Sequence, residues 1–332
     1  AGRRDKRIDY LELGALGAVE RFDCREGALR LDRVIEEIRA SPPSDARSQR
    51  EAARWIDLGN ILAIDHSPCD LRIAHAYDEA LAVLAATPDD TLTVRASLGK
   101  YLTLTYRLGA TASGQALTEL LERIEVRQPR LAPVLRLYRS LAWITLGRLA
   151  EAEADLDAAS VGEREPGIPA LLGFDVMLHA TRASVAALRG EVALVAASHV
   201  AALGSAEDDG LPFQALVALV HGAAQHTWLH EWDQAEAFAA RASALAQPFR
   251  IEYLEVLAEL VAAGARMRRE PDAEIDRFES LLCRRARLNE HSWDSLFLGW
   301  LAEAYLSVGD VRHPRERIEA ALEVAELSFR NE

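Results

Sequence analysis

The sequence has few cysteines and aromatic residues, and no long apolar run. Its three cysteines are scattered over 332 residues and form no CxxC pair. This excludes a zinc ribbon or a disulfide framework and is typical of a reducing, cytoplasmic compartment. Apolar runs stay below the ~18 residues that a membrane span needs. The N-terminus lacks an apolar signal-peptide core and begins without Met, so we expect a processed chain or a fragment of a longer protein.

Positive charge is also scarce. The chain has 38 Lys and Arg residues against 52 Asp and Glu residues, a formal net charge of −14. Nucleic acid requires a basic face, and so does an anionic membrane surface, so neither partner is expected. No GxxxxGK[ST] phosphate loop occurs, because Gly99-Lys100 is followed by Tyr101, and no GxSxG elbow occurs. We therefore expect no ATP hydrolysis, no cofactor and no metal.

The sequence does contain apolar residues at helical spacing, in repeated helix–turn–helix units. Residues 297–325 show one unit, with a stripe from Phe297 to Tyr305, a turn at Gly309 and a second stripe after Pro314. Neither helix can bury its stripe alone, so the two are expected to pair. About eight such units of roughly 40 residues follow one another. The sequence therefore predicts an all-α fold, a right-handed α-solenoid of about eight tetratricopeptide-like (TPR-like) hairpins.

Small residues mark where the helices of this array meet or turn. Trp55 and Gly59 fit the TPR pattern W-x2-L-G, in which we expect the glycine to let two backbones approach. His230 stands where other units have a turn glycine. A long connection is expected over residues 63–75, and an acidic loop over 205–210.

The Gly/Pro-rich stretch at residues 161–169 is the best candidate for a hinge. We expect one superhelical domain over residues 1–332, because a repeat array extends its core in one dimension. A subdivision into residues 1–160 and 170–332 is expected at this joint.

Three stretches carry a resemblance to a known family. They are DHSPCDLRIAHAYDEAL, LVHGAAQHTWLHEWDQAEAFAARASALA with His226 on the family histidine, and FLGWLAEAYLSVG. In this order they resemble the joints and hairpins of the TPR-like tails of bacterial STAND-type signalling ATPases. These include MalT-like transcription regulators and cyclase–ATPase–repeat fusions. The resemblance covers residues 50–328 and implies the ligand- or partner-binding repeat domain of a signal-transduction or transcription regulator, with no activity of the absent ATPase module.

Two groups of polar residues are candidates for chemical sites. His226 and His230 are four residues apart on one helix face, as helical metal ligands can be. They lack the glutamate of H-E-x-x-H, so we expect His226 in the hairpin packing and His230 at a helix C-terminus. Glu151, Glu153 and Asp155 are expected on a solvated helix face rather than as an acid–base pair.

Two classes of function remain open. The repeat pattern favours a non-catalytic sensor or interaction scaffold whose concave face binds an inducer, a peptide or a partner protein domain. The alternative is a helical enzyme with a site around the His226/His230 face. A second copy of the same chain, bound by self-association, is a further expected class of partner.

The first helix of each hairpin is expected to line the concave face. Six candidate binding residues are predicted on or near this groove: Asn60, Tyr106, Arg107, Ser184, Thr227 and Trp228. Their aromatic faces suit apolar contact, and their polar groups would orient a ligand. In an equally favoured alternative, Tyr106 and Trp228 have no binding role and only fill the space between adjacent hairpins.

Overall fold

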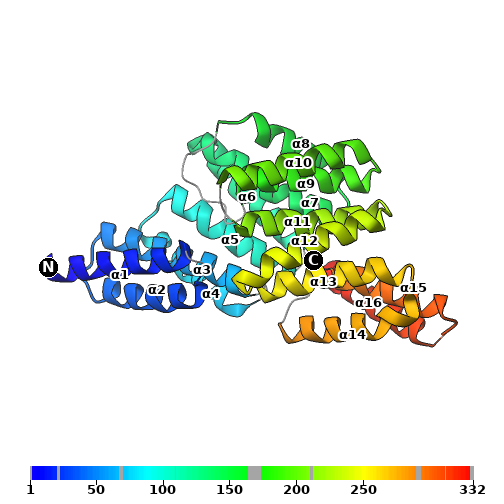
Figure 1. Ribbon diagram of the computed structural model, residues 1–332. Coiled ribbons are helices and arrows are strands. Elements are labelled where there is room, and N and C mark those ends of the chain that lie inside the picture. The colour runs from blue at the N-terminus through cyan, green and yellow to red at the C-terminus, as the bar shows by residue number, and fades with distance from the viewer. Residues whose placement is uncertain are drawn as a thin grey trace.

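The computed structural model describes residues 2–20, 23–66, 70–108, 110–163, 173–209, 212–288, 293–310 and 312–329. This part of the chain contains sixteen α-helices and no strand, which confirms the predicted all-α solenoid. The helices form successive hairpins that follow one another along a curved path (Figure 1). None of the described helices is both long and apolar enough to cross a lipid bilayer.

Each hairpin consists of an odd-numbered first helix and an even-numbered second helix. The first helices are α1 (Gly2–Glu20), α3 (Asp45–Asp65), α5 (Asp90–Leu108), α7 (Ala132–Thr145), α9 (Phe174–Leu188), α11 (Pro212–Trp228), α13 (Glu252–Met267) and α15 (Asp294–Ser307). The second helices are α2 (Cys24–Arg39), α4 (Leu71–Ala86), α6 (Ala110–Arg127), α8 (Leu149–Val161), α10 (Val192–Asp209), α12 (Trp232–Phe249), α14 (Pro271–Arg287) and α16 (His313–Phe329). A short 3-10 turn, Pro129–Leu131, precedes α7.

The tight turns within hairpins rely on residues in the left-handed region. Gly147, Gly190 and Gly309 have positive φ angles of 71°, 76° and 83°, and His230 adopts a φ of 58° at the equivalent turn. Glycine is the usual residue there because it has no Cβ to clash. His230 therefore occupies the turn position of its hairpin, as predicted from the sequence.

Two of the predicted connections are wrong. The connection expected over residues 63–75 is short, because α3 continues to Asp65 and the side chain of Asp70 accepts a hydrogen bond from the Arg72 amide (2.9 Å) at the start of α4. The loop expected over residues 205–210 is helical through Asp209. Ala206 is buried against α9 and α11, and this burial holds the last turns of α10 in place.

The Gly/Pro-rich joint lies between α8 and α9. α8 ends at Val161, α9 begins at Phe174, and residues 164–172 lie outside the described part of the chain. The hinge, and the subdivision of residues 1–332 at this joint, therefore stay predictions.

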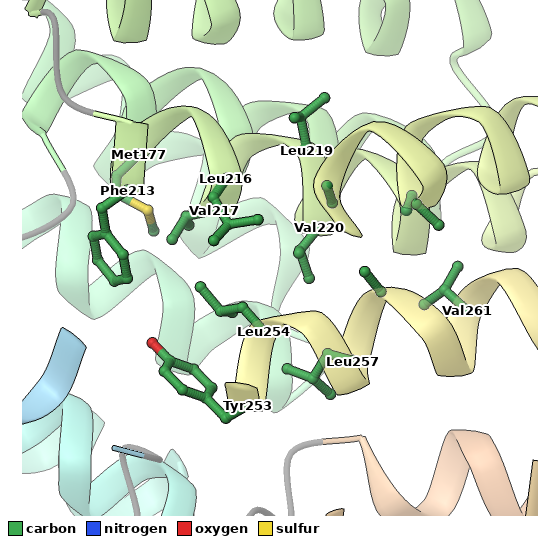
Figure 2. Close-up of a cluster of buried hydrophobic side chains, with 14 of the residues drawn as sticks. Met177, Phe213, Leu216, Val217, Leu219, Val220, Tyr253, Leu254, Leu257 and Val261 are labelled. Atoms are coloured by element: carbon green, nitrogen blue, oxygen red, sulfur yellow. The ribbon is translucent and has the colours of Figure 1, made fainter. Parts of the chain in front are cut away.

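Packing between hairpins depends on apolar residues of the first helices. Figure 2 shows Met177 of α9, Leu216 and Val220 of α11, and Leu254 and Leu257 of α13 meeting in one buried cluster. The second helices contribute alanines to the same core. Each fully buried Leu, Val or Met side chain stabilises the fold by about 1.5–3 kcal/mol. The cores of the hairpins from α5 to α15 are therefore continuous.

The last hairpin pairs as predicted but buries its second stripe only in part. Tyr305 of α15 stacks on His313 of α16, with ring centroids 4.9 Å apart. Ile318 and Leu322 of α16 are 44% and 58% exposed. The pairing of α15 and α16 therefore does not cover the whole α16 stripe.

The curved path brings α3 back against α13. Tyr253, in the first turn of α13, donates a hydrogen bond from its hydroxyl to the carbonyl oxygen of Ala63 (3.2 Å), 190 residues away. Ile64 packs against both of the largest apolar clusters, one centred on the N-terminal hairpins and one on the later hairpins. We call these two interactions the closure contact, and Figure 1 shows α13 beside the N-terminal hairpins.

Candidate functional site

The predicted concave-face residues on the later hairpins lie where α9 packs on α11. Ser184 and Thr227 are buried, and their hydroxyl groups donate to the carbonyl oxygens of Ala180 (3.2 Å) and Ala224 (2.6 Å). Trp228 is half-buried and packs against the apolar cluster of α9 and α10. Ser184 and Thr227 thus lie inside the wall of the superhelix, whereas Trp228 packs against its neighbours with part of its side chain and leaves the rest exposed.

The other predicted residues belong to the earlier hairpins. Asn60 of α3 is half-buried, and its Oδ1 accepts a hydrogen bond from the hydroxyl of Tyr77 (2.8 Å). Tyr106 and Arg107 lie on α5, and their side chains are outside the described part of the structure. The structure therefore gathers Ser184, Thr227 and Trp228 in one region and leaves Asn60 in another.

Charged residues join the adjoining sides of α1, α3 and α5. The Asp57 carboxylate lies 3.3 Å from both Arg54 and Arg95, and Arg54 lies 3.7 Å from Glu12. Burial raises the pKa of Asp57, although the two arginines oppose this shift. Because these charges neutralise one another, they hold the first helices in register and leave little free charge for a ligand.

The histidine region of α10 and α11 forms an internal network. Gln225 donates to the Ala180 carbonyl (2.8 Å) and the Ser184 hydroxyl (2.7 Å), and its Oε1 bonds His199. His226 is buried, 5.0 Å from the His199 ring between ring centroids, and its Nδ1 bonds Glu231 (2.7 Å).

These contacts show that His226 packs inside the hairpin, as predicted. No group of three or more His, Cys, Asp or Glu residues in the described ranges is placed to hold a metal ion. The packing of His226 supports a structural role over an enzyme site at the His226/His230 face.

The nearby His221 makes stability depend on pH. Burial, helped by nearby His199, lowers the pKa of His221 to about 4, and its ring lies edge-on to Trp293 at 6.0 Å. In the unfolded chain its pKa is near 6.5, so between about pH 6.5 and 4 the unfolded state binds more protons and stability falls as pH falls.

We therefore expect His221→Phe to flatten this acid slope while keeping an aromatic ring in place. The melting temperatures of wild type and variant, measured from pH 7.5 to 4.5, should diverge in favour of the variant below pH 6.5. Parallel curves for wild type and His221→Phe would contradict the assignment.

One carboxylate expected on a solvated face is buried. Asp155 accepts hydrogen bonds from Arg139 at 2.6 and 2.7 Å and from the Trp143 indole at 3.1 Å, whereas Glu151 and Glu153 are exposed as predicted. Asp155 faces α7 because it shares the inner face of α8 with the buried residues Ala152, Leu156 and Ala159. The Asp155 carboxylate therefore has a structural role, because its hydrogen bonds to Arg139 join α8 to α7, the two helices of the fourth hairpin.

A cavity of about 740 Å³ lies between α2, α3 and α4, and we call it the Trp55 pocket. Trp55, Leu58 and Leu62 share one face of α3 and form an apolar floor. Around them are residues from α2, from the last turn of α3 and from α4: Arg25, Ala28, Leu29, Asp32, Asp65, His66, Arg72 and His75.

The floor of the Trp55 pocket is rigidly held. The Arg39 guanidinium lies 5.1 Å from the centre of the Trp55 ring, and His75 meets the ring edge-on at 5.9 Å. Trp55 is only 8% exposed, and its Nε1–H has no hydrogen-bond acceptor within the described residues. This nitrogen atom is shielded from solvent, so Trp55 lines the pocket with the rest of its side chain.

Charges of both signs surround this floor. Burial and nearby Glu36 raise the pKa of Asp32, and Arg72 is held by Asp70 at 2.8 Å. Arg25 has no ion-pair partner in the described ranges. The predicted connection over residues 63–75 does not indicate this pocket, because Arg72 and His75 of its wall belong to α4. The spacing of Trp55, Leu58 and Leu62 is the signal in the sequence that indicates its floor.

Comparisons with known proteins show the fold alone. No family model matches the chain, and no curated protein matches it in sequence. The chain is similar in structure to a Rap protein complexed with Competence and Sporulation Factor, with 12% identity, a TM-score of 0.62, and coverage of 97% of this chain and 88% of that one.

Two further solved structures are more distant. The apo form of RapI has 9% identity and a TM-score of 0.48, covering 96% of this chain and 97% of that one. A STAND protein with a tetratricopeptide repeat sensor, PH0952 from Pyrococcus horikoshii, has 11% identity and a TM-score of 0.36. The match covers 98% of this chain and 43% of that one. The helical hairpins and the likeness to the Rap protein support a TPR-like repeat fold, and these comparisons do not identify the MalT-like family.

Proposed function

We propose that this chain is a non-catalytic binding scaffold whose Trp55 pocket receives an apolar side chain of a peptide or of an extended segment of a partner protein. The composition of the pocket carries this proposal. Trp55, Leu58 and Leu62 form an apolar floor, and charged groups of both signs stand around it. A concave apolar surface with a few polar groups at its edge is the usual form of a binding site.

The polar groups suit a peptide backbone. Asp32 and Asp65, which line the pocket, would accept hydrogen bonds from peptide N–H groups. Arg25 would contact an acidic side chain of the ligand. An indole floor of this kind is a typical anchor point in protein–peptide recognition.

The wider context supports a role in bacterial signal transduction or transcription regulation. The sequence resembles the repeat tails of STAND-type regulators, and the Rap protein of similar fold is described in complex with Competence and Sporulation Factor. In this proposal the concave face is a second contact surface, with Asn60, Tyr106, Arg107 and Trp228 as its contact residues. Ser184 and Thr227 act on that face indirectly, by holding α9 and α11 in place.

Selection from a random-peptide phage library tests the proposal. Peptides enriched on the wild-type chain should lose about tenfold or more in affinity on Leu29→Glu, because a carboxylate at this 54% exposed residue would repel the apolar anchor. Leu13→Glu on α1, at a residue 66% exposed and outside the pocket, is the matched control.

The outcomes separate the two surfaces. Binding that is unaffected by Leu29→Glu but lost on Arg107→Ala and Trp228→Ala would move the site to the concave face. No enrichment of any peptide over a repeat-free control protein would contradict the scaffold proposal itself.

A further inference from the structure

A second cavity lies where the closure contact joins α3 to α13. It has a volume of about 570 Å³, and we call it the seam pocket. Its lining comes from three separate parts of the chain: Asp65, His66, Asp70 and Leu71, then Arg250, Glu252 and Tyr253, then Arg287 and Leu288. The pocket exists only while α3 and α13 are in contact, because neither half of the chain encloses it alone.

The carboxylates of the seam pocket already have partners. Asp70 pairs with Arg72 at 2.8 Å, Glu252 with Arg284 at 2.9 Å, and Asp65 lies 3.3 Å from His66. Arg250 and Arg287 have no ion-pair or hydrogen-bond partner for their side chains within the described residues. The groups left free to bind a ligand are therefore two guanidinium ions, which are matched by carboxylate and phosphate oxygens.

The backbone at Arg250 is an independent sign of a binding role. Arg250 ends α12 with a φ of 55°, in the left-handed region where glycine is the favoured residue. A non-glycine residue there costs stability, and such costs concentrate at functional sites. An arginine at this position places its side chain in the seam pocket, which glycine could not do.

We propose that the seam pocket binds an oxyanion, a carboxylate or a phosphate group, between Arg250 and Arg287, and that the bound anion stabilises the closure contact. An anion held by Arg250 of the α12–α13 turn and Arg287 of α14 also faces the His66 imidazole at the end of α3. It therefore favours the closed arrangement over any state in which α3 and α13 separate. The seam pocket shares Asp65 and His66 with the Trp55 pocket, but Arg250 and Arg287 line the seam pocket alone.

Citrate and pyrophosphate are suitable probes, because they distinguish carboxylate from phosphate ligands. Isothermal titration at constant ionic strength, balanced with sodium chloride, should show one site per chain for at least one of the two. Arg250→Gln and Arg287→Gln should each weaken this binding by about ten- to a hundredfold. Arg277→Gln, at an exposed arginine on α14 outside the pocket, should bind as the wild type does.

Arg250→Gly separates binding from folding. It should melt at or above the wild-type temperature without ligand, because glycine adopts the left-handed conformation freely, and it should still lose the anion. Leu29→Glu should leave anion binding intact, which separates this site from the peptide site. Equal affinity of wild type, Arg250→Gly and Arg287→Gln, or no binding of either probe, would overturn the site.

Amide hydrogen exchange tests the effect on closure. Saturating anion should slow exchange in the last turn of α3 and the first turn of α13, and this slowing should shrink in Tyr253→Phe, which lacks the hydroxyl that bonds Ala63. Binding without any slowing in these two turns would overturn the proposed link between the anion and the closure contact.

Discussion

Replacing Asp155 with alanine is expected to destabilise the protein by about 3–5 kcal/mol, the cost of breaking a buried ion pair. Arg139 donates two hydrogen bonds to this carboxylate, Trp143 donates a third, and Arg136 lies 3.6 Å away. The side chain of Asp155 is 5% exposed and that of Arg139 is 15% exposed. Loss of the carboxylate would leave the Arg139 guanidinium largely buried without its counter-ion.

Glu153→Ala on the same helix is the matched control. Glu153 also forms an ion pair, with Arg189 at 2.8 Å, but its side chain is 49% exposed. Exposed pairs contribute about 0–1 kcal/mol, so this variant should unfold close to the wild type. Urea unfolding followed by circular dichroism measures both variants, and equal midpoints for Asp155→Ala and Glu153→Ala would contradict the buried ion pair.

The two carboxylates also show where sequence reasoning succeeds and where it stops. The helical pattern correctly predicts that Glu153 is exposed. It predicts the same for Asp155, because an acidic residue in an alanine-rich helix usually faces water, and this prediction is wrong. Its position with Ala152 and Leu156 on one helix face was visible in the sequence, but its partner Arg139 belongs to another helix, and their contact depends on the hairpin geometry.

The repeat architecture itself could be predicted because it depends on local signals. Helical periodicity, capping residues and turn positions such as His230 act within a few residues of one another. The Trp55 pocket and the seam pocket depend instead on how successive hairpins curve. The hydrogen bond from Tyr253 to Ala63 spans 190 residues, and no local pattern reports such a contact.

Gly59 shows, at a single residue, that a local sequence pattern does not identify the group that packs against it. The W-x2-L-G pattern correctly marked a close approach, but the group that approaches is an aromatic ring rather than a second backbone. A methyl group at Gly59 would lie 2.8 Å from the Tyr77 ring, and one at Gly99 would overlap the Cζ and hydroxyl of the same ring. Tyr77 of α4 thus fills a slot between α3 and α5 that two glycines leave open.

Gly99→Ala is therefore expected to destabilise the protein by about 1–3 kcal/mol, as overpacking does in a close-packed core. The Tyr77 ring is fully buried, so it cannot move aside without losing its hydrogen bond to Asn60. Gly204→Ala in α10 is the control, because a methyl group there meets no atom within 4 Å. In a helix interior that change should stabilise by about 0.5–1 kcal/mol.

A double-mutant cycle with Tyr77→Leu identifies the cause of the Gly99 effect. Leucine lacks the ring atoms that the new methyl group would overlap, so in this background Gly99→Ala should become neutral or stabilising, as Gly204→Ala is. Unfolding in urea gives the four free energies that the cycle requires. If Gly99→Ala costs the same with tyrosine and with leucine at position 77, then contact with the Tyr77 ring is not what excludes a side chain from position 99.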